Sequence, residues 1–205
     1  MARGSGGAAA ARVRAVAFDL MDTVLTDPFR EALTAAAGSS LEEVRARRDP
    51  AVYPAFERGE LTEAQFWQHH RDVGLEVDPA AFHRIRRQRT RFLPGMAELL
   101  DELAGRVVRA TASNYPIWIE ELADGVLDGR FEFVLASHHL GARKPDPGFY
   151  RRLLQRLGLG PDEVLFVDDR AVNVEGAREV GLAAHRFVDV VELRVWLGQQ
   201  GVSLG

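Results

Sequence analysis

The sequence predicts an α/β fold in which a parallel sheet is covered by helices on both faces and a block of helices is inserted after the first strand. Two observations predict this arrangement. After Pro94, short apolar segments alternate with amphipathic helical segments, which is typical of parallel strands joined by crossover helices. Between the first apolar segment and Pro94, residues 27–92 show only helical periodicity.

The first elements follow from local composition. Residues 1–12 are rich in Gly and Ala and show no packing pattern, so we expect a disordered tail. Residues 13–18 (VRAVAF) favour a buried strand that stops at Asp19. Turn-forming pairs such as Asp49-Pro50 then separate the helices expected in the inserted block, at 29–37, 40–47, 51–58, 62–73 and 79–91.

The second half of the chain supplies the rest of the sheet. Strands are expected at 106–112, 131–136, 163–167 and 182–187, and helices at 95–104, 116–124, 147–157, 171–180 and 190–199. The helix at 147–157 has clear end signals, because Asp146 is a good N-cap and Gly158 follows its last residue. The predicted organisation is a Rossmann-like core at 13–26 and 93–205 with a small helical cap at 27–92.

The composition favours small-molecule chemistry. The chain of 205 residues has no cysteine, which excludes disulfides, thiolate-bound zinc and a thiol nucleophile. A net charge of −4 does not predict binding to nucleic acid or to a membrane surface. Charged residues interrupt every apolar run before the roughly 18 residues that a membrane span needs. We therefore expect a soluble, cytoplasmic protein whose partner is a small molecule.

Polar side chains gather where the predicted strands end. Asp19 follows the first strand, Ser113 and Asn114 follow the second, and Asp168 and Asp169 follow a later one. Ligands of open α/β sheets bind at this carboxyl edge. Carboxylates that converge there repel each other unless a cation lies between them, and oxygen ligands of this kind favour Mg²⁺. The sequence thus predicts a site for magnesium and a phosphate group.

The basic residues add a second signal, because Lys144 is the only lysine among 26 basic residues. A compact ammonium group beside the carboxylates suits neutralisation of a phosphate or of an attacking carboxylate. Each residue alone has an ordinary structural explanation, since Asp forms turns, Ser113 and Asn114 suit a helix start, and one lysine is compatible with surface composition. Their convergence on one edge favours the functional interpretation.

Four segments in this order resemble the signature motifs of the haloacid dehalogenase superfamily of phosphohydrolases. They are FDLMDTVL at 18–25, ATASN at 110–114, RKPDPGFY at 143–150 and FVDDRAVN at 166–173. The resemblance covers residues 13–187, and the inserted block is similar to the small cap of subfamily I members. The segments MDTVLTDPF, SNYPIW and RKPDPGFY resemble more narrowly the flavin mononucleotide hydrolases of plant chloroplasts and their bacterial relatives.

The resemblance implies roles for the matching residues. Asp19 is the implied nucleophile, which forms an aspartyl-phosphate, and Asp168 holds the lysine or a metal-bound water. The implied ligands of Mg²⁺ are Asp19, the backbone carbonyl of Met21, and Asp169. Arg143 and Asn173 are supporting residues. Substrate contacts, including support of the nucleophile loop, are expected from Thr23, Ser113, Asn114 and Lys144.

The sequence departs from the family at Met21, where most of the phosphatases have a second aspartate that serves as general acid and base. Loss of that group typically lowers a rate by about 10²–10⁴-fold, and Asp22 is the candidate replacement. We expect a magnesium-dependent phosphatase for a small phosphomonoester, with flavin mononucleotide as the candidate substrate. Two alternatives stay open: a 2-haloacid dehalogenase, which the paired Asp168 and Asp169 disfavour, and a non-catalytic module that binds a phosphorylated metabolite.

Substrate specificity is expected in the cap. Candidates for a surface that stacks on a flavin ring are Tyr53, Phe56, Phe66, Trp67, His69, His70 and Trp118. The alternative is that Phe56, Phe66 and Trp67, which have helical spacing, form the cap's own core, with both histidines at the surface or pocket rim. The arginines of residues 83–91 cannot all share one helix face, so we expect a solvated face from which one arginine at most reaches a substrate phosphate.

Overall fold

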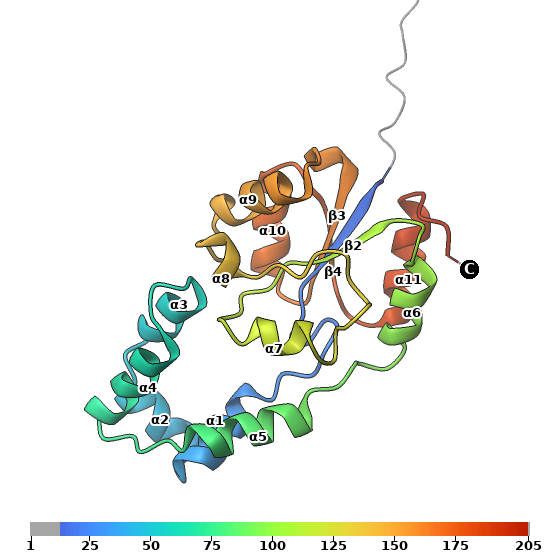
Figure 1. Ribbon diagram of the computed structural model, residues 1–205. Coiled ribbons are helices and arrows are strands. Elements are labelled where there is room, and N and C mark those ends of the chain that lie inside the picture. Colours follow the sequence, from blue (N-terminus) through green and yellow to red (C-terminus); the bar gives the residue numbers. More distant parts are fainter. Residues whose placement is uncertain (1–12, 205) are drawn as a thin grey trace, which may run out of the picture.

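The computed structural model describes residues 13–204 and contains a parallel sheet covered by helices on both faces (Figure 1). The strand order is β2-β1-β3-β4, with both partners of β1 aligned in parallel. The bounds are β1 Ala15–Phe18, β2 Val108–Thr111, β3 Val164–Asp168 and β4 Ala183–Arg186. The predicted α/β fold is therefore confirmed, whereas the expected tail at 1–12 lies outside the described residues.

Side chains of β1 alternate between two apolar clusters, one on each face of the sheet. Val16 and Phe18 join the cluster that contains α6 (Met96–Leu103), α7 (Ile119–Ala123) and α11 (Val190–Gln199). Ala15 and Ala17 join the cluster built from helices on the opposite face, α9 (Pro147–Leu157) and α10 (Ala171–Glu179). Every residue of β1 is fully buried, as expected for a central strand with helices on both faces.

The helical block between β1 and β2 agrees closely with the expected helices. Its members are α1 Phe29–Ala37, α2 Leu41–Arg47, α3 Val52–Glu57, α4 Glu63–Asp72 and α5 Pro79–Arg89. Local capping explains the boundaries, since Ser40 and Thr62 each accept a hydrogen bond from the backbone three residues later and begin α2 and α4. In Figure 1 the block extends to one side of the sheet, with α7 between the two.

Three buried aromatic side chains of the block pack on one another and on Trp118, which precedes α7. Phe56 and Phe66 stack with ring centroids 4.6 Å apart, and Trp67 and Trp118 stack at 5.9 Å. All four are buried. The flavin-stacking hypothesis is therefore wrong for these four residues, none of which lines the cavity. The alternative that Phe56, Phe66 and Trp67 form the core of the block is confirmed, because their helical spacing directs them inward.

Two further expectations for the block need correction. His70 is buried instead of lying at the surface, because its Nδ1 lies 2.9 Å from the carbonyl oxygen of Phe66. Among the arginines of residues 83–91, Arg86 is also buried, and its guanidinium donates to the Tyr115 hydroxyl at 3.1 Å and to Glu121. Arg86 thus ties α5 to the core instead of reaching a substrate phosphate.

The segment 131–136 does not form the predicted strand. It makes two isolated bridges instead, one from Phe133 to Ala110 on β2 and one from Ala136 to Ser113 just after β2. The reason is that the Thr111 hydroxyl both accepts from the Leu135 N–H and donates to the Leu135 carbonyl, each at 2.8 Å. This side chain takes the place of one bond of the backbone ladder, next to the bond from the Thr111 N–H to the Phe133 carbonyl at 2.9 Å. The segment then turns into the short helix α8 (Ser137–Leu140), which the sequence did not predict. Within residues 13–204, the helices are too short or too polar to cross a membrane.

Candidate active site

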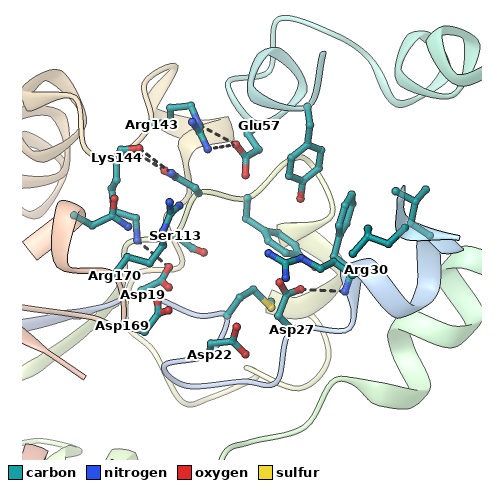
Figure 2. Close-up of a pocket in the computed structure, with 18 of the residues that line it drawn as sticks. Asp19, Asp22, Asp27, Arg30, Glu57, Ser113, Arg143, Lys144, Asp169 and Arg170 are labelled. Atoms are coloured by element: carbon teal, nitrogen blue, oxygen red, sulfur yellow. Dashed lines mark hydrogen bonds and ion pairs between the residues drawn. The ribbon is translucent and has the colours of Figure 1, made fainter. Parts of the chain in front are cut away.

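A cavity of about 480 Å³ lies between the carboxyl edge of the sheet and the helical block (Figure 2). The sheet edge contributes Asp19, Ser113, Asn114, Lys144 and Asp169, among others. The opposite side is formed by α1, α2 and α3 and includes Phe29, Arg30, Arg48, Tyr53 and Glu57. One cavity therefore joins the polar strand ends to the inserted helices.

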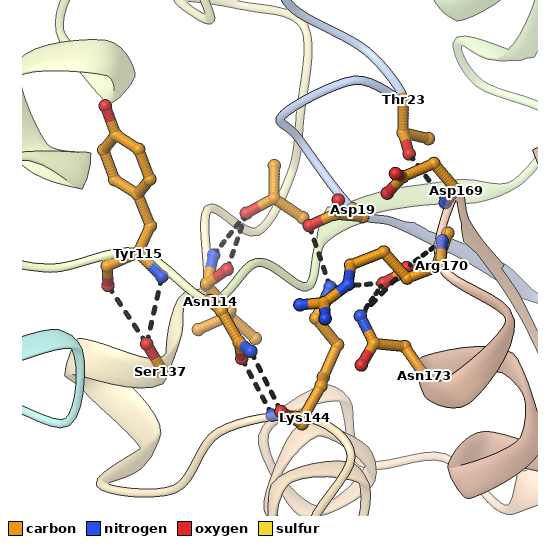
Figure 3. A network of polar contacts seen from close by, with 12 residues as sticks. Asp19, Thr23, Asn114, Tyr115, Ser137, Lys144, Asp169, Arg170 and Asn173 are labelled. Atoms are coloured by element: carbon orange, nitrogen blue, oxygen red, sulfur yellow. Dashed lines mark hydrogen bonds and ion pairs between the residues drawn. The ribbon is translucent and has the colours of Figure 1, made fainter. Parts of the chain in front are cut away.

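The centre of the site is an ion-paired lysine between two aspartates (Figure 3). Asp19 directly follows β1 and Asp168 ends β3, and the parallel pairing of these strands brings both carboxylates to one edge. The ammonium of Lys144 donates to Asp19 Oδ1 at 2.8 Å and to Asp168 Oδ2 at 2.6 Å. Because Lys144 is only 2% exposed, its charge depends on these two partners.

Asp168 is enclosed by donors. Besides Lys144, the Asn173 amide donates to its two oxygens at 3.0 and 3.1 Å, and the Arg170 N–H donates to Oδ1 at 2.9 Å. The residue has no exposed surface. These contacts hold Asp168 in place against the lysine, and Asn173 also lines the cavity.

The loop that carries Lys144 is fixed from two sides. The Asn114 amide donates to the Lys144 carbonyl at 3.0 Å, and Asn114 Oδ1 accepts from the Lys144 N–H at 2.8 Å. On α10, a Cβ added at Gly176 lies 2.7 Å from the carbonyl oxygen of Pro145, so only glycine allows this approach. Asn114 also lines the cavity, and its contact with a phosphate stays a prediction.

The loop after Asp19 contains the other residues singled out by the sequence. Thr23 is fully buried, and its hydroxyl accepts from the Asp169 N–H at 3.1 Å, so it supports Asp169 instead of contacting substrate as expected. Met21 and Asp22 line the cavity. Asp22 has a left-handed backbone with φ 60°, a conformation that Asp tolerates better than most residues.

Burial governs the electrostatics of the site. It raises the pKa of Asp19 to about 7, against the opposing effect of Lys144 and with a further rise from Asp168. Burial, Asp168 and Asp22 together raise the pKa of Asp169. The protein therefore does not fully neutralise the carboxylates of Asp19 and Asp169, which face the cavity.

The carboxylates fit a divalent cation. One oxygen from each of Asp19, Asp168 and Asp169 lies within 4.8 Å of the others. Asp168 is satisfied by protein donors, whereas within residues 13–204 no other residue donates to the Asp169 carboxylate, and Asp19 Oδ2 has no donor either. Hard oxygen ligands of this kind suit Mg²⁺, with Asp19, the Met21 carbonyl and Asp169 as the residues that would hold it.

Several cavity residues were missed by sequence reasoning. Glu57 at the end of α3 is 4% exposed, and its carboxylate accepts from Arg143 Nε at 2.9 Å. Its backbone carbonyl accepts from the Ser137 hydroxyl at 2.7 Å. No sequence pattern indicates a role for Glu57, because it is a single acidic residue in an apolar helix and belongs to no motif. Also missed were Asp27, Arg30, Arg45, Arg48 and Arg170, in a chain where arginine is common.

Comparison with known proteins identifies the family. A family model described as haloacid dehalogenase-like hydrolase matches residues 13–181. Flavin mononucleotide hydrolase 1 of Arabidopsis thaliana, named as chloroplastic, is 32% identical over 189 residues, which cover 91% of this chain and 77% of the relative.

Solved structures agree on the fold. A haloacid dehalogenase (HAD) family enzyme of Bacteroides thetaiotaomicron superposes with a TM-score of 0.75 at 21% identity, covering 89% of this chain and 98% of the other. L-2-haloacid dehalogenase of Xanthobacter autotrophicus superposes with a TM-score of 0.62 at 25% identity, covering 93% and 84%. With the family model matching most of the sequence, the chain belongs to the haloacid dehalogenase-like hydrolases and is an enzyme.

Proposed function

We propose that this enzyme, a phosphoric monoester hydrolase, requires magnesium and transfers the phosphoryl group of a small phosphomonoester to Asp19. The observation that supports it most is the placement of the Asp19 carboxylate. It stands at the end of the central strand, is paired with a buried lysine at 2.8 Å, and opens on the cavity beside Asp169. A carboxylate held in this way is oriented for attack.

The proposed reaction has two steps. A carboxylate oxygen of Asp19 attacks phosphorus while the bond to the ester oxygen breaks, and the leaving oxygen takes up a proton from Asp22. Water then gives a proton to Asp22 as it attacks the aspartyl-phosphate, which releases inorganic phosphate and restores Asp19 and the protonated Asp22. Ser113, which lines the cavity, is placed to contact a phosphoryl oxygen, and Lys144 offsets the negative charge. Magnesium, when bound, supplies further positive charge at the phosphate.

Flavin mononucleotide is the candidate substrate. The proposal is supported by the similarity to the Arabidopsis enzyme of that name and by a cavity of about 480 Å³, a size typical of small-molecule sites. Phe29 and Tyr53 line the cavity with ring centroids 4.6 Å apart and offer an aromatic side to a ring. The cytoplasmic location stays a prediction, since that relative is named as a chloroplast protein.

The first test measures phosphate release from flavin mononucleotide and a panel of other phosphomonoesters, with magnesium and with EDTA. We expect release that depends on magnesium. Chloride release from 2-chloropropionate in EDTA, with no phosphate release, would favour the dehalogenase. Binding of phosphate in the presence of magnesium without turnover of any ester would instead favour the non-catalytic module.

A second test addresses the acid and base missing at Met21. We predict that Asp22→Asn lowers kcat by at least about 10²-fold, because Asp22 lines the cavity next to Met21 and a positioned acid/base is typically worth that much. The loss should be largest for esters with poor leaving groups, which need the proton most.

Asp27→Asn is the matched control for this test. Asp27 lines the same cavity, but its carboxylate accepts from the Phe29 N–H at 3.0 Å at the start of α1. Its kcat should change much less than that of Asp22→Asn. The reverse order of effects would move the acid/base role from Asp22 to Asp27.

A further inference from the structure

We propose that the helical end of the cavity is a subsite for acceptor oxygens of the leaving group, bound by the guanidinium groups of Arg30, Arg45 and Arg48. The proposal rests on the phosphatase function above and specifies its substrate class. The non-reacting end of the ester would carry a carboxylate, a second phosphate or the carbonyl edge of a flavin ring.

The three arginines lie together on the inserted block. Arg30 belongs to the first turn of α1, Arg45 to α2, and Arg48 directly follows α2. All three line the cavity, as do the apolar side chains of Leu33, Leu41 and Val44. Figure 2 shows Arg30 on the side of the block, across the cavity from Lys144. A substrate whose phosphate lies at Asp19 therefore directs its other end toward them.

These guanidinium groups lack ion-pair and hydrogen-bond partners in the described part of the chain. None of the three forms an ion pair within 4.0 Å or donates a hydrogen bond there, whereas Arg143 of the same cavity is paired with Glu57 at 2.8 Å. Asp27 is an acidic neighbour of Arg30 but acts on it only at longer range. The positive charge at this end of the cavity is therefore available to a ligand.

Arg48 is the most constrained of the three. It is half-buried, and its guanidinium carbon lies 5.8 Å from the centre of the Tyr53 ring. Burial lowers the pKa of Arg48, and the nearby charge of Arg45 lowers it further, against opposing effects of Tyr53 and Glu57. A half-buried cation next to a like charge is unfavourable alone and is stabilised by an anionic or carbonyl group that accepts from both.

The test compares two esters that differ only at the far end, phenyl phosphate and 4-carboxyphenyl phosphate. The readout is the ratio of their kcat/KM values for each variant, in which the intrinsic reactivity of the two esters cancels. We expect Arg48→Met to lower the preference for the carboxylate ester by about tenfold, the usual worth of a charge-assisted hydrogen bond. Arg45→Met should act in the same direction, and because Arg45 is exposed and unpaired among the described residues, misfolding does not explain its effect.

Arg84→Met is the matched control, since Arg84 is exposed on α5 outside the cavity, and it should keep the wild-type ratio. Flavin mononucleotide is assayed in parallel. A loss of kcat/KM only for the flavin in both cavity variants supports the subsite and identifies carbonyl oxygens as its ligand. Unchanged ratios and unchanged flavin hydrolysis in both variants overturn the subsite, while absence of hydrolysis by the wild type overturns the proposed function instead.

Discussion

Asp19→Asn is expected to abolish phosphate release, with a loss of kcat on the order of 10⁴-fold or more, because the variant removes the attacking oxygen and keeps the side-chain shape. The measurement is single-turnover phosphate release with magnesium at saturating substrate. Release within tenfold of the wild-type rate would exclude Asp19 as the nucleophile. This variant does not separate a phosphatase from a dehalogenase, since both use the same carboxylate.

The stability of Asp19→Asn provides the control for folding. Burial raises the pKa of Asp19 from 3.8 to about 7, so in this interval the metal-free folded state binds a proton that the unfolded state has lost. The contribution of Asp19 to the free energy of unfolding of the wild type in EDTA therefore rises as the pH falls from about 7 toward 3.8. In Asp19→Asn this contribution is absent, and at pH 8 the variant should be at least as stable as the wild type. A large loss of stability would show that its inactivity reflects unfolding.

Lys144→Met is expected to lower the free energy of unfolding by about 3–5 kcal/mol, because it leaves Asp19 and Asp168 buried without their shared cation. Methionine fills much of the space of the aliphatic stem, so the loss reports on the ammonium group and not on a cavity. Urea denaturation in EDTA at pH 8 measures the effect, since both carboxylates need their partner most when they are ionised.

Arg151→Met is the matched control for the lysine. Arg151 is exposed on α9 and donates to no partner in residues 13–204, so its replacement should change the free energy of unfolding by no more than about 0.5 kcal/mol. Equal effects of the two variants would contradict the central role of Lys144 in holding the strand ends together. Saturating magnesium should recover part of the stability lost in Lys144→Met, since a bound cation also offsets the two carboxylates.

Much of the fold was predictable because its signals are local. Strand β1 and the first four residues of β3 are uninterrupted apolar runs. The ends of α9 follow from Asp146 and Gly158, whose capping roles depend only on neighbouring backbone. The segment at 131–136 was mispredicted because its pairing depends on the Thr111 hydroxyl, a contact across more than 20 residues of sequence. Strand propensity carries no information about such a contact.

The candidate site was predictable where residues follow strand ends and unpredictable where they come from the inserted helices. Topology brings Asp19, Asp168 and Asp169 together regardless of the details of the loops. The cavity arginines of the inserted block and Glu57 owe their positions to the packing of α1, α2 and α3. All but one of the 26 basic residues are arginine, so no single arginine stands out in the sequence, whereas Lys144 does.

The hydrogen bonds around Asp168 are formed when the chain folds, before a ligand binds. Its oxygens are held by Lys144, Asn173 and the Arg170 N–H before any ligand arrives. In the proposed reaction, the dipoles around the lysine would therefore not need to reorient as charge moves between Asp19 and phosphorus, because their ordering is completed when the chain folds. In water, the same ordering would have to be repeated for every molecule that reacts. The site thus carries low reorganisation energy as a built-in property of the sheet edge, independent of which ester fills the cavity.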